Sequence, residues 1–367
     1  MKTSTILIVG AVVVIIAIAS VAAYWFMFLA EPGPRKLYVQ VQPGQTAVVE
    51  QYIVPLMLEK HDCEVVVAEA ISNEALSKVM AAPDDPPYDV IRVDAYPFVQ
   101  GKNADLWATL NQSEAPNINE IPTWLQDADM KGIGMSWYTM GIGYMPELLE
   151  ANGIPPPDSW WDLWDPALNG KATIQSISST WSVFFMIEIA CALADDPEAY
   201  ANETLMMAGL EKIKELRDIG NIGVFHGASS EMLALMEAGE VWAGHQAAYR
   251  IVGGLVEKGV NASWVPCETG LLGFTYTCIT EGSNNKDMAH KFINYLLDAE
   301  FLAEWHRKTR QAVGNEKALA YLTPNELESY DIMYPEGIDE ILISPDWEYV
   351  AEHQPDWTEW WNANIEI

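Results

Sequence analysis

The sequence predicts an α/β protein, because short apolar runs alternate with segments of helical spacing from Lys36 onward. Successive strand–helix–strand units favour a parallel sheet with right-handed crossovers. The chain has 367 residues, of which 50% are hydrophobic, so it is long enough for two globular units. We therefore expect two α/β units that follow a separate N-terminal segment.

The first thirty residues differ from the rest of the chain. No charged residue lies between Lys2 and Glu31, and residues 6–23 are almost all aliphatic or small. A helix over 3–30 would measure about 42 Å, more than the roughly 30 Å of a bilayer core. Its apolar part is longer than the about 7–15 residues of a signal peptide. We expect an uncleaved transmembrane helix at 1–30 and a linker at 31–35, with a cleaved signal as the alternative; either places the remainder outside the cytoplasm.

The charge and the cysteines exclude several classes of partner. The net charge is −32, from 52 acidic and 20 basic residues, which makes nucleic acid and anionic membrane surfaces poor partners. The four cysteines have no C-x-x-C spacing, so no metal site is expected. A disulfide between Cys267 and Cys278 and four buried free thiols remain as alternatives.

The first predicted elements follow in order along the chain. Strands are expected at 37–41, at 64–68 and within 86–96, and helices at 46–60 and 73–80. Prolines prevent long helices at 111–124. A glycine-rich extended stretch from 132 then leads to a helix that starts near Pro146, since proline suits the first helical turn.

The segment 159–174 contains Trp160, Trp161 and Trp164 and raises a choice between a structural staple and an aromatic ligand platform. Trp160 and Trp164 share one face of a short helix, a pattern typical of core packing. Asp158 or Ser159 is expected to cap this helix. We therefore predict the structural role, followed by a turn and a strand that starts at 172.

The remaining elements complete the alternation. Helices are expected at 181–193 and 203–219, a turn, strand and helix at 239–250, a strand at 273–279, and a strongly amphipathic helix at 285–305.

Several of these segments together resemble the spermidine/putrescine-binding group of the extracytoplasmic solute-binding proteins of ABC importers. The resemblance covers about 40–367 and is carried by "PPYDVIRVD" (86–94), "GIGYMPELLEANGIPPPDSWWDLWDPALNGKAT" (141–173), "MEAGEVWAG" (236–244), "TEGSNNKDMAHKFINYLLD" (280–298), "AVGNEKAL" (312–319) and "WTEWWNANI" (357–365). A departure is Met145, where the family usually has Asn.

This resemblance implies a two-lobed periplasmic-binding-protein type II fold with the ligand in an interlobe cleft. Lobe one would comprise 36–139 and 276–345, lobe two 140–275, and a C-terminal helix at 346–367 would brace the hinge. The implied function is hinge closure on a small polar solute and its delivery to ABC permease subunits. A surface sensor on the same fold is the alternative. No cofactor is implied, and the absence of G-x-S-x-G, H-E-x-x-H and P-loop motifs argues against an enzyme.

Candidate ligand contacts lie beyond the carboxyl ends of the predicted strands, where open α/β sheets bind ligands. The resemblance supports Tyr96 as an aromatic ligand residue and places Thr275 and Tyr276 at the hinge, where alternation lets only one of them face the cleft. The full set is Gln42, Gln45, Asp94, Tyr96, Ser179, Thr180, Trp181, His245, Gln246, Tyr249, Thr275 and Tyr276. Helix capping by Asp94 or the serines and a structural role for His245 are the alternatives.

The chain departs from the polyamine binders at the positions of their carboxylates. The turn at 178–182 and the crossing strand carry hydroxyls instead, among them Ser178, Ser182 and Thr275. A buried ammonium without a carboxylate costs several kcal/mol, of which aromatic faces recover about 0.5–2 kcal/mol each. This departure favours a neutral or anionic solute, for which Arg92 or Arg250 would supply positive charge if they face the cleft.

Overall fold

The computed structural model describes residues 34–179 and 181–366. The predicted transmembrane helix and Thr180 lie outside the described residues. Within the described ranges, no helix combines the length and apolarity needed to cross a membrane.

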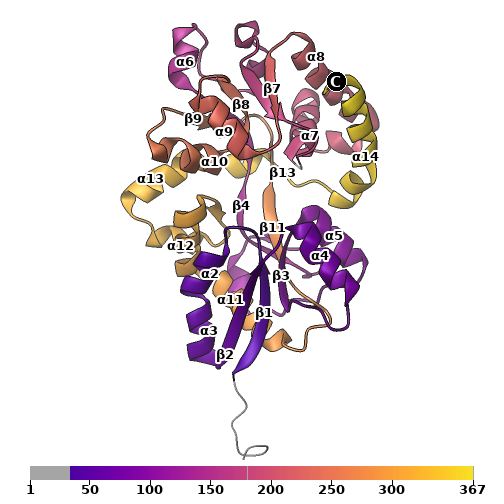
Figure 1. Ribbon diagram of the computed structural model, residues 1–367, viewed down its shortest axis with the longest axis vertical. Helices are drawn as coiled ribbons and strands as arrows, with labels where there is room; N and C mark the ends of the chain where they lie inside the picture. Colours follow the sequence, from indigo (N-terminus) through magenta and orange to yellow (C-terminus); the bar gives the residue numbers. More distant parts are fainter. Residues whose placement is uncertain (1–33, 180, 367) are drawn as a thin grey trace, which may run out of the picture.

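Two sheets with their helices form two lobes, one above the other along the long axis of the molecule (Figure 1). The first sheet has the strand order β12-β4-β11-β3-β1-β2. Its strands are β1 (Arg35–Val41), β2 (Cys63–Glu69), β3 (Val90–Asp94), β4 (Ile133–Tyr138), β11 (Gly273–Ile279) and β12 (Ala312–Val313). β1 pairs in parallel with β2 and β3, whereas β11 is antiparallel to β3 and β4. The predicted parallel sheet is thus only partly right, because β11 enters from the second lobe and runs against the first strands.

The second sheet has the order β7-β6-β8-β5-β9 and is also mixed. Its strands are β5 (Met140–Tyr144), β6 (Ala172–Gln175), β7 (Ile222–His226), β8 (Ala243–Ala247) and β9 (Ser263–Val265). Every residue of the central strand β8 is buried, so its polar side chains must find partners inside the lobe.

The chain passes between the sheets at two adjacent places. β4 continues into β5 through Thr139 alone, and β10 (Gly270–Leu271) leads directly into β11. β10 also pairs with β13 (Leu342–Ile343), a strand from near the C-terminus. The first sheet therefore takes its strands from 35–138 and 273–313, and the second from 140–265.

Helices cover both sheets, with α2 and α3 on one side of the first sheet and α4 and α5 on the other (Figure 1). The helices of the first lobe are α2 (Thr46–Tyr52), α3 (Val54–His61), α4 (Ser72–Ala81), α5 (Ala95–Asn103), α11 (Lys286–Leu296), α12 (Ala299–Thr309) and α13 (Pro324–Met333). Those of the second lobe are α6 (Pro146–Ala151), α7 (Trp181–Ala194), α8 (Glu203–Asp218), α9 (Ser229–Glu237) and α10 (Ala248–Gly254), and α14 (Trp347–Asn364) follows at the C-terminal end.

Two predicted helices are each divided in the structure. The helix expected at 46–60 breaks at Ile53, because Pro55 has no N–H to donate and opens the first turn of a new helix. The helix expected at 285–305 breaks before Asp298, whose carboxylate accepts hydrogen bonds from the backbone N–H groups of Glu300 and Phe301.

The tryptophan segment is structural, as predicted. It forms a short 3-10 helix (Trp160–Trp164) that begins with a capping box between Ser159 and Asp162. Trp160 is fully buried and its indole N–H donates to the backbone oxygen of Thr269 at 2.9 Å.

All four cysteines are buried free thiols, so the structure has no disulfide between Cys267 and Cys278. Cys278 lies in the first sheet on β11, whereas Cys267 lies in the loop between β9 and β10.

Candidate functional site

A cavity of about 610 Å³ lies between the two lobes. This volume falls within the range of about 300–1,000 Å³ that is usual for small-molecule sites. The starts of α4 and α5 contribute from the first lobe, the start of α7 from the second, and the crossing segment before β11 and one side of α14 complete the lining. The lining residues are Ile71, Ser72, Asn73, Asp94, Ala95, Tyr96, Pro97, Tyr138, Trp181, Val183, Phe184, Leu272, Gly273, Phe274, Trp347, Val350, Ala351, Gln354, Pro355 and Thr358.

Asp94 reaches this cavity because it ends β3 and forms the N-cap position of α5. The Ser72 hydroxyl donates to its Oδ2 at 2.8 Å, and the side-chain amide of Gln42 donates to the same hydroxyl at 2.8 Å. The carboxyl faces the cavity, yet the surrounding walls desolvate it and raise its pKa, while the Ser72 bond and the charge of Arg92 act in the opposite direction. The prediction of Asp94 as a cleft residue is therefore matched by its position.

Aromatic side chains form much of the wall around Asp94. Tyr96 follows it by two residues and is 42% exposed. The rings of Tyr138 and Trp181 lie 5.6 Å apart between centroids, so a residue of the crossing strand meets one of the second lobe. Gly273 permits this arrangement, since a Cβ atom there would come within 2.4 Å of the Tyr138 ring. Burial raises the pKa of Tyr138 well above its ordinary value, so its hydroxyl stays protonated.

Gln45 and Thr275 do not line the cavity. Both accept hydrogen bonds from the guanidinium of Arg92, at 2.5 Å and 2.8 Å respectively. Arg92 is 1% exposed and lies 4.8 Å from the centroid of the Trp305 ring. Burial lowers its pKa to about 10, so it remains a cation at neutral pH. These residues form an internal network in the first lobe, and Gln42 belongs to the same lobe without lining the cavity.

Tyr276 and Tyr249 also lie away from the cavity lining. Tyr276 stacks on Phe98 with 3.8 Å between ring centroids and shares its face of β11 with Phe274, which does line the cavity. Tyr249 is buried against Tyr138, 5.3 Å between centroids, and the guanidinium of the exposed Arg250 lies 4.8 Å from the centroid of the Tyr249 ring.

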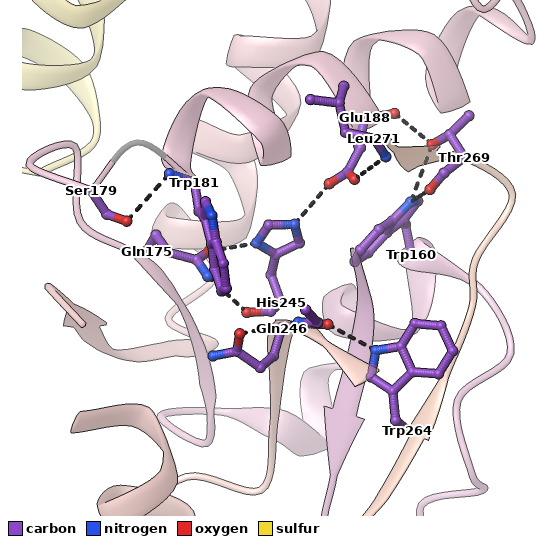
Figure 2. A network of polar contacts seen from close by, with 11 residues as sticks. Trp160, Gln175, Ser179, Trp181, Glu188, His245, Gln246, Trp264, Thr269 and Leu271 are labelled. Carbon is purple, nitrogen blue, oxygen red and sulfur yellow. Dashed lines mark hydrogen bonds and ion pairs between the residues drawn. The ribbon is translucent and has the colours of Figure 1, made fainter. Parts of the chain in front are cut away.

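The structure corrects the prediction that His245 and Gln246 lie at the cleft, because both side chains are fully buried on the central strand β8. His245 contacts the Glu188 carboxylate through Nε2 at 2.7 Å and the Gln175 side chain through Nδ1 at 2.5 Å (Figure 2). Glu188 also accepts the backbone N–H of Leu271 at 2.6 Å. Burial raises the pKa of Glu188. The polar groups of β8 thus stabilise the second lobe and link α7 to the crossing segment at β10.

The turn before α7 has mainly a capping role in the structure. The Ser179 hydroxyl accepts the backbone N–H of Trp181 at 3.3 Å (Figure 2), while Ser178 contacts the Ser176 hydroxyl and Ser182 is fully buried. Of the predicted residues in this turn, Trp181 alone among the described ones reaches the cavity.

The contribution of α14 was missed by the sequence prediction. Trp347, Val350, Ala351, Gln354 and Thr358 face the cavity at helical spacing, and this stripe is the signal that could have revealed it. The helix contacts α5 in the first lobe. Beyond its end, a carboxylate bonds the second lobe: Glu366 accepts from the Ser176 hydroxyl at 2.7 Å and the Ile177 N–H at 2.9 Å.

Comparisons with known proteins agree with this geometry. Residues 52–330 match the family model described as bacterial extracellular solute-binding protein. The putrescine/cadaverine-binding protein of Pseudomonas aeruginosa is 25% identical over 256 residues, 64% of this chain and 68% of that protein. The putrescine-binding periplasmic protein PotF of Escherichia coli is 26% identical over 286 residues, 72% and 74% of the two chains. The crystal structure of an ABC transporter from Clostridium perfringens has the same fold, with a TM-score of 0.76 and 22% identity over 90% of this chain and 99% of that one.

Proposed function

The chain belongs to the family of bacterial extracellular solute-binding proteins, and we propose that it captures a small organic solute between its lobes for delivery to an ABC permease. The observation that carries this proposal is the cavity itself, whose lining comes from both lobes and from the segment that crosses between them. A solute bound there would touch both lobes and the segment that crosses between them.

The mechanism requires no covalent step. A solute that contacts both lobes binds the closed arrangement better than the open one and therefore shifts the population toward closure. The two adjacent crossings, at Thr139 and before Gly273, are the places where the chain can bend. α14, which contacts α5 and is followed by the Glu366 bonds to the second lobe, would brace this hinge.

Amines are the solute class that the site and the relatives favour. Two relatives are named for putrescine, and one of these also for cadaverine. Asp94 lines the cavity, whereas no basic side chain does so among the described lining residues. The net charge of −32 also attracts cations and repels anions. A neutral or anionic solute, which the hydroxyls at 178–182 favoured, has no such support.

The location completes the proposal. The apolar segment at 1–30 would hold the binding lobes at the outer face of the cell membrane, next to the permease. Retention of the full chain in a salt-washed membrane fraction tests this part.

A thermal-shift panel on the full chain tests the binding function. It includes putrescine, spermidine, thiamine, amino acids, sugars, sulfate and small organic acids, after partial unfolding and refolding to remove carried-over solute. A solute at about a hundredfold excess over its Kd adds about 2.7 kcal/mol of stability, which raises Tm by a few degrees. We expect such a shift with an organic cation of the panel, and no shift with the sugars, sulfate or organic acids. An unchanged Tm across the whole panel counts against solute capture.

A further inference from the structure

The described residues that line the cavity include a single formal charge. Asp94 is the only ionisable acid or base other than tyrosine among the described residues that line it. Thr180, which precedes Trp181 in the sequence, is uncharged by its chemistry. The acidic residues of α14 are exposed and do not line the cavity, among them Glu352, Asp356 and Glu359.

Asp94 lacks a basic partner among the residues that the structure describes. Its Oδ2 accepts from the neutral Ser72 hydroxyl. The nearby cation, Arg92, directs its guanidinium to Gln45 and Thr275 instead. Asp94 is exposed to solvent in the cavity, so its carboxylate can pair with a bound cation.

The rest of the lining is aromatic and apolar. Tyr96 follows Asp94 on the same helix start, and Tyr138 and Trp181 add two further rings. Phe184 and Trp347 lie 5.8 Å apart between ring centroids and form an aromatic pair from α7 and α14. Aromatic faces attract a cation and equally accept hydrocarbon. A second ammonium group placed among these side chains would be desolvated with no carboxylate to pair with it.

We propose that the physiological solute is a small organic cation with one positive charge and an apolar body, rather than a linear diamine. The charged group binds at Asp94, and the body lies against Phe184, Trp347 and the apolar side of α14. This inference rests on the proposed function and names the substrate class of its site.

The test compares two probes that differ only in the second amine. Isothermal titration of the full chain at neutral pH uses n-pentylamine and cadaverine, which share a five-carbon body, with choline as a quaternary ammonium arm. We expect pentylamine or choline to bind at least tenfold more tightly than cadaverine. A tighter Kd for choline than for pentylamine assigns the quaternary class, and the reverse order assigns the primary amines; either order supports a single charge.

The role of Asp94 is tested with Asp94→Asn, which keeps the size of the side chain and removes its charge. Glu74→Gln is the matched control, because Glu74 is an exposed carboxylate on α4 that pairs with Lys78 outside the cavity. We expect Asp94→Asn to weaken binding of the monoamine at least tenfold and Glu74→Gln to leave it unchanged. Acidification through the raised pKa of Asp94 should weaken binding to the wild type and leave any residual binding to Asp94→Asn unaffected.

The outcomes separate this inference from the proposed function. Tighter binding of cadaverine than of pentylamine overturns the single-charge inference and leaves solute capture standing. Binding of a neutral or anionic panel member, without binding of any amine, also overturns the single-charge inference and leaves solute capture standing. The probe comparison uses the wild type, so it decides the question even where Asp94→Asn fails to fold. No binding of any solute contradicts both.

Discussion

Replacement of Glu188 by alanine is expected to lower the free energy of unfolding by about 3–5 kcal/mol, the usual cost of removing one partner from a buried polar pair. Glu188 is fully buried, its carboxyl group lies 2.7 Å from Nε2 of His245, and it accepts a hydrogen bond from the backbone N–H of Leu271. Truncation leaves both of these buried groups without their hydrogen-bond partner, at about 1–3 kcal/mol each, and opens a small cavity. Urea denaturation of the full chain, followed by circular dichroism, measures the loss.

Glu188→Gln is the matched control for this prediction. Glutamine has nearly the same volume and keeps an oxygen that can accept the Leu271 N–H, so the loss should be clearly smaller than with alanine. Equal losses for the two variants would show that the retained acceptor for the Leu271 N–H contributes little and that the contact between the carboxyl group and His245 accounts for the loss. An alanine variant as stable as the wild type would contradict the assignment of His245 to a structural network.

Trp160→Ala is expected to cost about 3–5 kcal/mol of stability, the usual range for removal of a buried tryptophan. The side chain is 0% exposed, its ring lies 5.7 Å from that of Phe185, and its N–H donates to Thr269. It does not line the cavity. The solute Kd, measured by titration below the temperature at which the variant unfolds, should therefore remain within about twofold of the wild-type value.

The neighbouring Trp161 supplies the comparison, because it is only partly buried. Trp161→Ala should lose much less stability than Trp160→Ala. If folded Trp160→Ala lost its solute affinity while its stability was retained, the tryptophan segment would be a ligand platform, which is the interpretation that the burial of Trp160 opposes.

The sequence predicted those strands whose apolar runs are bounded by turn residues, whereas β7 and β9 were not predicted. The strand at 273–279 matches β11 at both ends, since Gly273 opens it and charged or polar residues follow. The helix breaks were harder to predict, because the apolar periodicity at 46–60 and 285–305 continues across each break. A proline in one case and a capping aspartate in the other decide the division.

The predicted residues that line the cavity are those placed by strand ends. Asp94 and Tyr96 follow the end of β3, and Trp181 starts the helix after β6, so all three line the cavity. His245 does not line the cavity, because β8 is central and buried on both faces, which the sequence does not show. Thr275 does not line the cavity either, because its hydroxyl points toward Arg92 and accepts a hydrogen bond from it.

The contribution of α14 required the tertiary structure for a different reason. Its residues lie far from Trp181 in the sequence, yet they form the same cavity wall. The family resemblance implies a C-terminal helix at 346–367, but it does not say which of the side chains of that helix line the cavity. The cavity of a two-lobed chain is therefore set by long-range packing as much as by its strand ends.

Small-angle X-ray scattering of the full chain, with and without the solute that gives the largest thermal shift, tests the central claim most directly. Capture between the lobes predicts that the radius of gyration falls on saturation and that the fall follows the binding isotherm. Saturation of the protein with an unchanged scattering curve would contradict capture by lobe closure.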